Sequence, residues 1–130
     1  MPTVTFRDET ASGTRLDEIS LPDLPERMTA RQLVRLRVRE EVARYNAQPS
    51  RHFRGLVRPD DAEVELNGYR LREARRIDWE RQADIAEQAF DHNGYVLLVR
   101  DRQVDSLDEV VDLTDDSEIV FIRLLPLTGG

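Results

Sequence analysis

The sequence predicts an α+β fold with an N-terminal β-hairpin, one long helix and two central strands, together with an inserted β-hairpin and a second helix. Three observations carry this prediction. Side chains near the N-terminus alternate between apolar and polar, as they do in a half-buried strand. A long helical pattern follows at about 29–46. Two apolar runs, at 95–99 and 118–124, are typical of central strands that are covered on both faces.

The first element is an N-terminal β-hairpin. Thr3–Arg7 alternates apolar and polar residues, the segment 11–14 has the composition of a turn, and Arg15–Ile19 reads as the returning strand. Pro22 and Pro25 follow, and proline lacks the N–H group that a strand ladder needs. The hairpin is therefore expected to end before these prolines.

The long helix has a well-marked start. Thr29 is followed three residues later by Gln32, the capping-box pattern in which each side chain bonds the other residue's backbone N–H. This pattern predicts a helix from Thr29 to about Asn46. One face of this helix carries three arginines spaced four residues apart: Arg31, Arg35 and Arg39. We expect a solvated face there rather than a binding surface.

The next segment, at about 47–93, differs in character and reads as an insertion within a single domain over 1–130. Asn67-Gly68 suits a type I′ turn, which predicts a hairpin over 64–71 with Glu65 opposite Arg70 and Val64 opposite Leu71. Leu66 would then face Tyr69 on the same apolar side as Val64.

A second helix is predicted after this hairpin. Asp78 can cap a helix from Trp79 to about Phe90, with Asn93-Gly94 as its stop. His52 and His92 have no partners at metal-ligand spacing, so we expect ordinary loop or cap histidines and no metal site or cofactor.

Charge and composition exclude several classes of function. The net charge is −7 and the pI is about 4.9, whereas general nucleic-acid binding needs a basic surface. The chain has no cysteine, which excludes a disulfide framework, a cysteine-ligated zinc site and a cysteine nucleophile. No apolar run approaches the length that spans a bilayer, and the N-terminus does not read as a signal peptide. A cytoplasmic protein with no membrane partner is expected.

The sequence ends in two glycines directly after the last predicted strand. The preceding residues are Leu125, Pro126, Leu127 and Thr128, and the chain then finishes with Gly129-Gly130. A frayed end is one interpretation. The chemical interpretation is that residues without a Cβ can lie extended in a narrow channel and bring the terminal carboxylate to the α-phosphate of ATP.

The order of elements, from hairpin and long helix to two central strands and the diglycine, resembles the order in ubiquitin. The resemblance covers residues 1–46 and 94–130, and the stretch Tyr95–Val104 is similar to the third ubiquitin strand and the short strand after it. As a whole, the chain is similar to bacterial ubiquitin-like proteins that are encoded beside an activating enzyme, a conjugating enzyme and a peptidase. The resemblance implies a ubiquitin-like β-grasp, in which a mixed sheet packs on one long helix.

The resemblance implies a protein modifier rather than an enzyme. Gly130 would be the residue activated by adenylation and joined to a target by an isopeptide or ester bond, with Gly129 beside it in the channel. The tail residues Leu125, Pro126, Leu127 and Thr128 would be read by a dedicated activating enzyme, because ubiquitin carries arginines before its glycines. A conjugating enzyme and a deconjugating peptidase would be the other partners.

A partner patch can be placed by strand alternation. If Leu97 and Val99 point into the core, Leu98 points outward, and Ile122 does so on the last strand. The resemblance places Leu98 and Ile122 near the exposed apolar patch of ubiquitin, with Arg100 beside them. The alternative is that the helix of the insertion covers them.

Two other functions stay open. The first is a sulfur carrier, in which the adenylated diglycine becomes a thiocarboxylate. The second is a non-covalent β-grasp adaptor or a self-assembling subunit. An enzyme is the least favoured class, because no nucleophile–base pair, metal cluster or phosphate loop is recognisable.

All 19 basic residues are arginine, and lysine is absent. Codon usage in a GC-rich genome is one explanation. Whatever the cause, no side-chain amine is present to accept the activated tail, which leaves the α-amino group or hydroxyls as acceptors.

Overall fold

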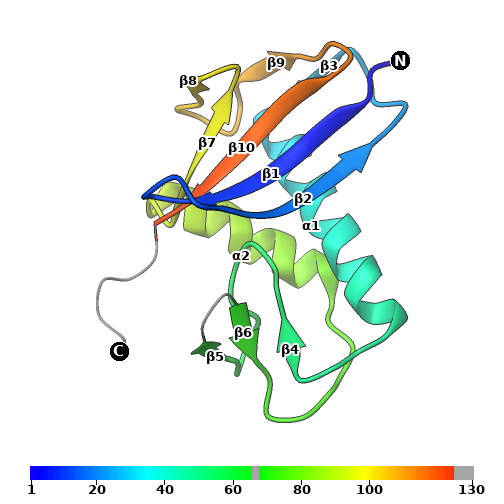
Figure 1. The fold of residues 1–130 in the computed structure, drawn as a ribbon, viewed down its shortest axis with the longest axis vertical. Coiled ribbons are helices and arrows are strands. Elements are labelled where there is room, and N and C mark those ends of the chain that lie inside the picture. The colour runs from blue at the N-terminus through cyan, green and yellow to red at the C-terminus, as the bar shows by residue number, and fades with distance from the viewer. Residues whose placement is uncertain (66–67, 125–130) are drawn as a thin grey trace. The chain divides into compact units, whose positions relative to one another are not determined.

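The structure is a computed structural model that describes residues 1–65 and 68–124 (Figure 1). The described residues form a mixed α+β arrangement of ten strands and two helices. In chain order these are β1 (Val4–Thr10), β2 (Arg15–Leu21), β3 (Arg27–Thr29), α1 (Ala30–Ala47), β4 (His52–Phe53), β5 (Glu63–Glu65), β6 (Gly68–Arg70), α2 (Trp79–Asp91), β7 (Tyr95–Val99), β8 (Arg102–Gln103), β9 (Val110–Asp112) and β10 (Ser117–Arg123).

The chain divides into two compact units. The first unit comprises Met1–Leu33 and Phe90–Gly130, and the second comprises Val34–Ala89. The second unit covers most of the segment predicted as an insertion, and it also takes in the larger part of α1.

The first unit contains a five-stranded mixed sheet in the order β2-β1-β10-β7-β8. The first and last strands of the chain, β1 and β10, lie parallel at its centre, and every other pair is antiparallel (Figure 1). The predicted N-terminal hairpin is confirmed, because β1 and β2 pair. The prediction of β7 and β10 as central strands is also confirmed, because each has a neighbour on both sides. A separate short ladder joins β3 to β9.

One face of the five-stranded sheet carries the core of the first unit. The buried side chains alternate along the strands as expected: Val4 and Phe6 on β1, Leu97 and Val99 on β7, and Ile119 and Phe121 on β10. Three aromatic rings contact one another in this core. The ring centroids of Phe6 and Phe121 are 6.3 Å apart, and those of Tyr95 and Phe121 are 5.8 Å apart. Rings in offset or edge contact stabilise a core beyond the area that they bury.

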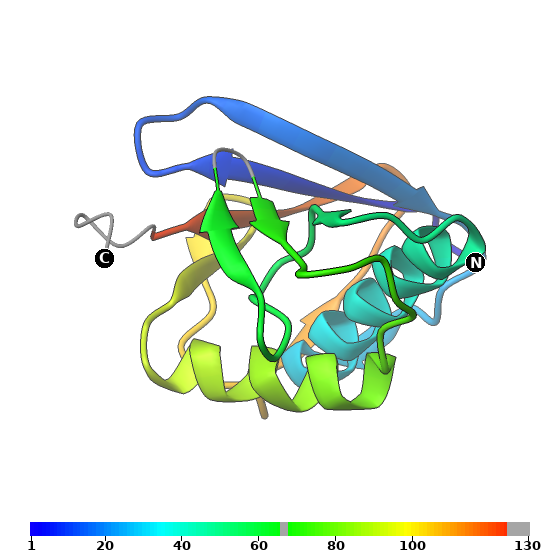
Figure 2. The same cartoon turned by 90° about the horizontal axis from the view of Figure 1, so that it is seen from below.

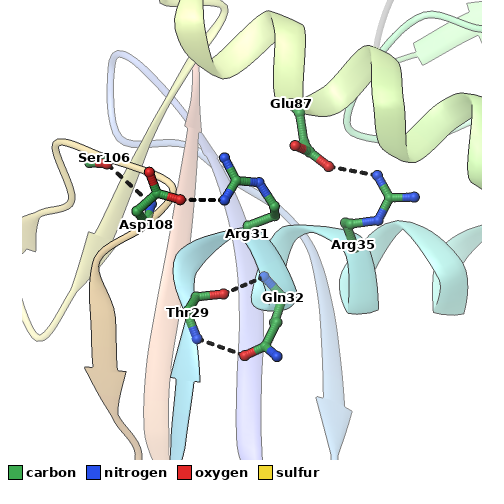
Figure 3. A network of polar contacts seen from close by, with 7 residues as sticks. All are labelled: Thr29, Arg31, Gln32, Arg35, Glu87, Ser106 and Asp108. Atoms are coloured by element: carbon green, nitrogen blue, oxygen red, sulfur yellow. Dashed lines mark hydrogen bonds and ion pairs between the residues drawn. The ribbon is translucent and has the colours of Figure 1, made fainter.

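The capping box at the start of α1 is confirmed. The backbone N–H of Thr29 donates to Oε1 of Gln32 at 2.9 Å, and that of Gln32 donates to Oγ1 of Thr29 at 3.1 Å (Figure 3). The two residues between Thr29 and Gln32 bond to a different segment. The backbone N–H groups of Ala30 and Arg31 donate to the carbonyls of Glu109 and Leu107, respectively. The first donors of the helix are therefore satisfied within the first unit.

The second unit combines the rest of α1, most of α2 and a three-stranded sheet in the order β4-β6-β5. The two helices lie side by side in both views (Figures 1 and 2). The predicted cap of α2 is confirmed, since Oδ1 of Asp78 accepts the backbone N–H of Glu80 at 3.0 Å. Ala83 and Ala86 of this helix are fully buried.

The predicted register of the 64–71 hairpin is wrong. Val64 pairs with Tyr69 and Glu63 with Arg70, so the register is shifted by two residues from the predicted one. Val64 is 59% exposed, so it does not form a buried apolar face with Leu71. The predicted turn residue Asn67 and its neighbour Leu66 lie outside the described residues.

The physical reason for this shift is Gly68. It begins β6 rather than completing a turn, and its φ is outside the left-handed region that a type I′ turn requires. A Cβ at this position would lie 2.9 Å from the carbonyl oxygen of Phe53 on the paired strand β4. The glycine therefore permits a close approach of two strands.

Neither helix in the described part of the chain is long and apolar enough to cross a bilayer.

Candidate functional site

The last described strand is fixed at its end by a buried ion pair. Nη2 of Arg123 donates to Oδ2 of Asp8 at 2.8 Å, and the two side chains are 8% and 2% exposed. The pair joins β10 to its parallel neighbour β1. Nε of Arg123 is buried without a hydrogen-bond partner among residues 1–65 and 68–124. Burial of this kind makes the pair sensitive to the loss of either member.

The predicted tail begins immediately after this anchor. The backbone N–H of Leu124 donates to the carbonyl of Gly94 at 3.3 Å, and the Leu124 side chain is 39% exposed. The predicted conjugation residues Gly129 and Gly130 lie outside the described residues, as do the predicted tail-recognition residues Leu125, Pro126, Leu127 and Thr128. The structure thus describes the base of the tail and not its chemistry.

The outer face of the sheet carries a half-buried apolar quartet. Leu98 pairs with Val120 and Ile122 pairs with Val96 across β7 and β10, so the four side chains share one face. All four are partly exposed, whereas their neighbours along each strand are buried. The two predicted patch residues, Leu98 and Ile122, are therefore diagonal neighbours.

Sequence reasoning missed the other two members of this quartet. Val96 and Val120 follow the same alternation that placed Leu98 and Ile122, so the signal was present. Only the register of β7 against β10 shows that the four residues form one group.

Arg100, the third predicted patch residue, lies in the turn between β7 and β8. It has a positive φ of 51°, and the next residue, Asp101, has a φ of 64°. Nη2 of Arg100 donates to the carbonyl of Asp112 at 3.3 Å and to Oγ1 of Thr114 at 3.1 Å. These contacts hold one end of its guanidinium within the first unit.

A charged trio lies beside the quartet on the same face. Arg7 of β1 is the register partner of Val120, and its side chain is 11% exposed. Its Nε contacts Glu9 at 3.0 Å and its Nη1 contacts Glu118 at 3.0 Å. An apolar centre with a satisfied polar margin is the composition that protein-binding surfaces share.

The arginine row of α1 is a partly solvated face: Arg39 is exposed, whereas Arg31 and Arg35 are intermediate and contact carboxylates. Arg31 contacts Asp108 within the first unit (Figure 3). In the second unit, Nη1 of Arg35 contacts Asp84 at 3.0 Å and Glu87 at 2.6 Å. Figure 3 shows the contact with Glu87.

The row is therefore tied to carboxylates and to one aromatic ring. The hydrogen bonds that Arg35 donates to Asp84 and Glu87 raise the pKa of its guanidinium group. The guanidinium carbons of Arg35 and Arg39 lie 5.8 Å and 5.7 Å from the centre of the Trp79 ring, which is within cation–π range.

The histidines give no metal centre in the described part of the chain. Nδ1 of His52 lies 2.8 Å from Oε1 of Glu65, and both side chains contact solvent. Within residues 1–65 and 68–124, no three histidine, aspartate or glutamate side chains are grouped so that they could hold a metal ion.

Comparisons with known proteins give no further assignment. No protein-family model matches the chain, and neither a curated protein nor a solved structure matches it significantly.

Proposed function

We propose that this protein is a ubiquitin-like modifier with a β-grasp fold, which is activated at Gly130 by a dedicated adenylating enzyme and then conjugated to target proteins. The observation that carries the proposal is the five-stranded sheet. Numbered along the chain, its strands run 2-1-5-3-4 with the first and last parallel at the centre. This sheet joins the hairpin and the central strands whose order along the chain resembles that of ubiquitin. A conjugating enzyme and a deconjugating peptidase are the other proposed partners.

The chemistry assigned to the tail is acyl activation. A carboxylate oxygen of Gly130 attacks the α-phosphorus of ATP, and pyrophosphate leaves. An enzyme thiolate then attacks the acyl carbon, AMP leaves, and a thioester forms. A nucleophile on the target displaces the thiolate in the last step. The proposal holds whether Gly130 ends the chain as synthesised or is exposed by a peptidase.

The base of the tail supports this assignment. The Arg123–Asp8 pair fixes the end of β10, the last described strand. A six-residue segment such as 125–130 can span at most about 22 Å, at about 3.3–3.6 Å per residue. Such a reach suits entry of the last glycines into an enzyme channel while the folded unit stays outside it.

The outer face supplies a surface on which the partner enzymes could bind. The quartet of Val96, Leu98, Val120 and Ile122 provides apolar area, and Arg7 provides a fixed charge beside it.

The test is mass spectrometry of the protein recovered from its native cell, together with a Gly129→Val variant. We expect adducts joined through Gly130 and their loss in the variant, because a Cβ at residue 129 would block a narrow channel. A thiocarboxylate at Gly130, with sulfur in place of one oxygen, would instead show a sulfur carrier. Recovery of unmodified protein only, with no adenylation by a cognate enzyme, would leave the non-covalent adaptor.

A further inference from the structure

The cations of this chain are chemically uniform. All 19 are guanidinium groups, so none of the 130 residues carries a side-chain amine. Isopeptide formation needs a neutral amine to attack the acyl carbon. Lysine, with a pKa near 10.4, supplies a neutral fraction, whereas arginine stays protonated and its nitrogens share their lone pairs with the guanidinium system.

At some of these positions the arginine makes contacts through two of its nitrogens. Arg7 uses Nε for Glu9 and Nη1 for Glu118. Arg81 uses Nε and Nη2 for the two carboxylate oxygens of Asp60, at 2.9 Å and 3.3 Å. A lysine has a single nitrogen on a flexible stem and lacks this planar fork. The local contacts at these sites therefore favour arginine over lysine, whatever the codon usage.

Other positions do not have this requirement. Arg102, on the edge strand β8, contacts Glu109 through Nη2 only, and its side chain is 63% exposed. An ammonium group could make that single contact. The absence of lysine at such a position is not explained by local packing.

We propose that the chain is built so that it cannot accept its own activated tail at a side-chain amine, which restricts its conjugates to one copy per acceptor or to chains joined through the α-amino group or a hydroxyl ester. The inference rests on the proposed function. In the excluded step, a neutral amine would attack the carbonyl carbon of the Gly130 thioester. A C–N bond would form, the C–S bond would break, the thiolate would leave, and the amine proton would pass to solvent.

The test needs no enzyme. A donor chain with a Gly130 thioester, made by intein cleavage with a small thiol, is mixed at pH 9 with acceptor chains whose α-amino group is acetylated and whose C-terminus is not activated. The acceptors are the unaltered sequence, Arg102→Lys and Arg102→Gln. The last variant removes the contact with Glu109 without supplying an amine. Free lysine serves as a small-molecule acceptor.

We expect free lysine and Arg102→Lys to be acylated, with the second adduct mapped to residue 102 and resistant to hydroxylamine. The unaltered acceptor and Arg102→Gln should give at least about a hundredfold less of such adducts, because the neutral fraction of lysine at this pH exceeds that of arginine by at least that factor. The inference is overturned by a hydroxylamine-resistant adduct at an internal residue of the unaltered acceptor. It is equally overturned if Arg102→Lys or free lysine reacts no more than the unaltered acceptor, since arginine would then not be the source of protection.

This outcome is separate from that of the proposed function. The enzyme-free reaction reports only on the nucleophiles of the chain. Absence of Gly130 adducts in the native cell would contradict the modifier function and leave the measured reactivity unchanged.

Discussion

Nε of Arg37 donates to Oε2 of Glu41 at 3.1 Å, one helical turn along α1, and the two side chains are 4% and 7% exposed. The other carboxylate oxygen of Glu41 accepts the backbone N–H of Leu56 at 3.0 Å. The pair therefore ties the loop after β4 to the helix. The i, i+4 spacing alone predicts an exposed pair of small effect, whereas the burial makes it a central contact of the second unit.

The first prediction concerns this pair. Glu41→Ala should lower the free energy of unfolding by about 3–5 kcal/mol, because it removes the carboxylate from a buried ion pair with Arg37 and from the backbone N–H of Leu56. Glu63→Gln is the matched control in the same unit, since Glu63 contacts Arg70 at 3.6 Å with a side chain that is 76% exposed. That control should cost less than about 1 kcal/mol. Urea unfolding followed by circular dichroism measures both, and equal losses would contradict the prediction.

The sequence predicts those parts of the fold whose signals are local. The β1–β2 hairpin, the capping box of Thr29 and the cap at Asp78 each depend on residues close together in the chain, and each is confirmed. The alternation along β7 and β10 also correctly separates buried from outward side chains, because one face of each strand is enclosed.

The parts that the sequence does not predict depend on distant partners. The Asn67-Gly68 pair predicts a turn, whereas Gly68 lies in a strand where a Cβ would be 2.9 Å from the carbonyl oxygen of Phe53, on another strand. The Arg123–Asp8 anchor joins residues 115 positions apart, and no spacing rule connects them. The β3–β9 ladder likewise pairs two three-residue strands that are too short to show periodicity.

The second prediction concerns the packing around Phe53. A Cβ at Gly55 would lie 2.1 Å and 2.3 Å from Cε2 and Cζ of the Phe53 ring, which is 2% exposed. Gly55→Ala should therefore destabilise the protein by about 1–3 kcal/mol through overpacking. Phe53→Leu removes the clashing ring atoms. The double variant should therefore lose less stability than the sum of the losses measured for Gly55→Ala and Phe53→Leu alone. Strict additivity in denaturant unfolding would show that the clash is not with this ring.

The third prediction concerns pH. The hydrogen bond from Arg81 lowers the pKa of Asp60 below its ordinary value of 3.8. A carboxyl group whose pKa is lower in the folded than in the unfolded state stabilises the fold at pH values above its unfolded-state pKa. This stabilisation is lost as the pH falls through its folded-state pKa. The stability difference between the unaltered protein and Asp60→Asn should thus be present near neutral pH and vanish well below pH 3.8.

Arg81→Gln supplies the control for this pH dependence. It removes the guanidinium that lowers the pKa of Asp60, so in that background the stability difference for Asp60→Asn near neutral pH should be smaller than in the unaltered protein. Urea midpoints measured across the acid range compare the two backgrounds, and a difference for Asp60→Asn that persists at the lowest pH would refute the assignment.

The fourth prediction concerns the turn after β7. Val99 pairs with Arg102, so Arg100 and Asp101 form a two-residue turn in which both have positive φ. A left-handed conformation costs a residue with a Cβ roughly 1–2 kcal/mol, and glycine avoids this cost. Asp101→Gly should therefore raise the free energy of unfolding by about 1 kcal/mol. Asp105→Gly, outside the left-handed region, should instead lower it, and thermal unfolding of the two variants should shift in opposite directions.

The last prediction separates folding from partner binding on β7. Leu97 is fully buried, so Leu97→Ala should cost about 2–5 kcal/mol of stability. Leu98 points to the opposite face and is partly exposed, so Leu98→Ala should cost less than about 1 kcal/mol.

If the apolar quartet binds the activating enzyme, Leu98→Ala should still raise the modifier concentration needed for half-maximal adenylation. The maximal rate should change little, because truncation removes apolar contact area at the interface. An unchanged half-maximal concentration, measured by pyrophosphate release with folded variant protein, would remove Leu98 from that interface and leave the outer face without this role.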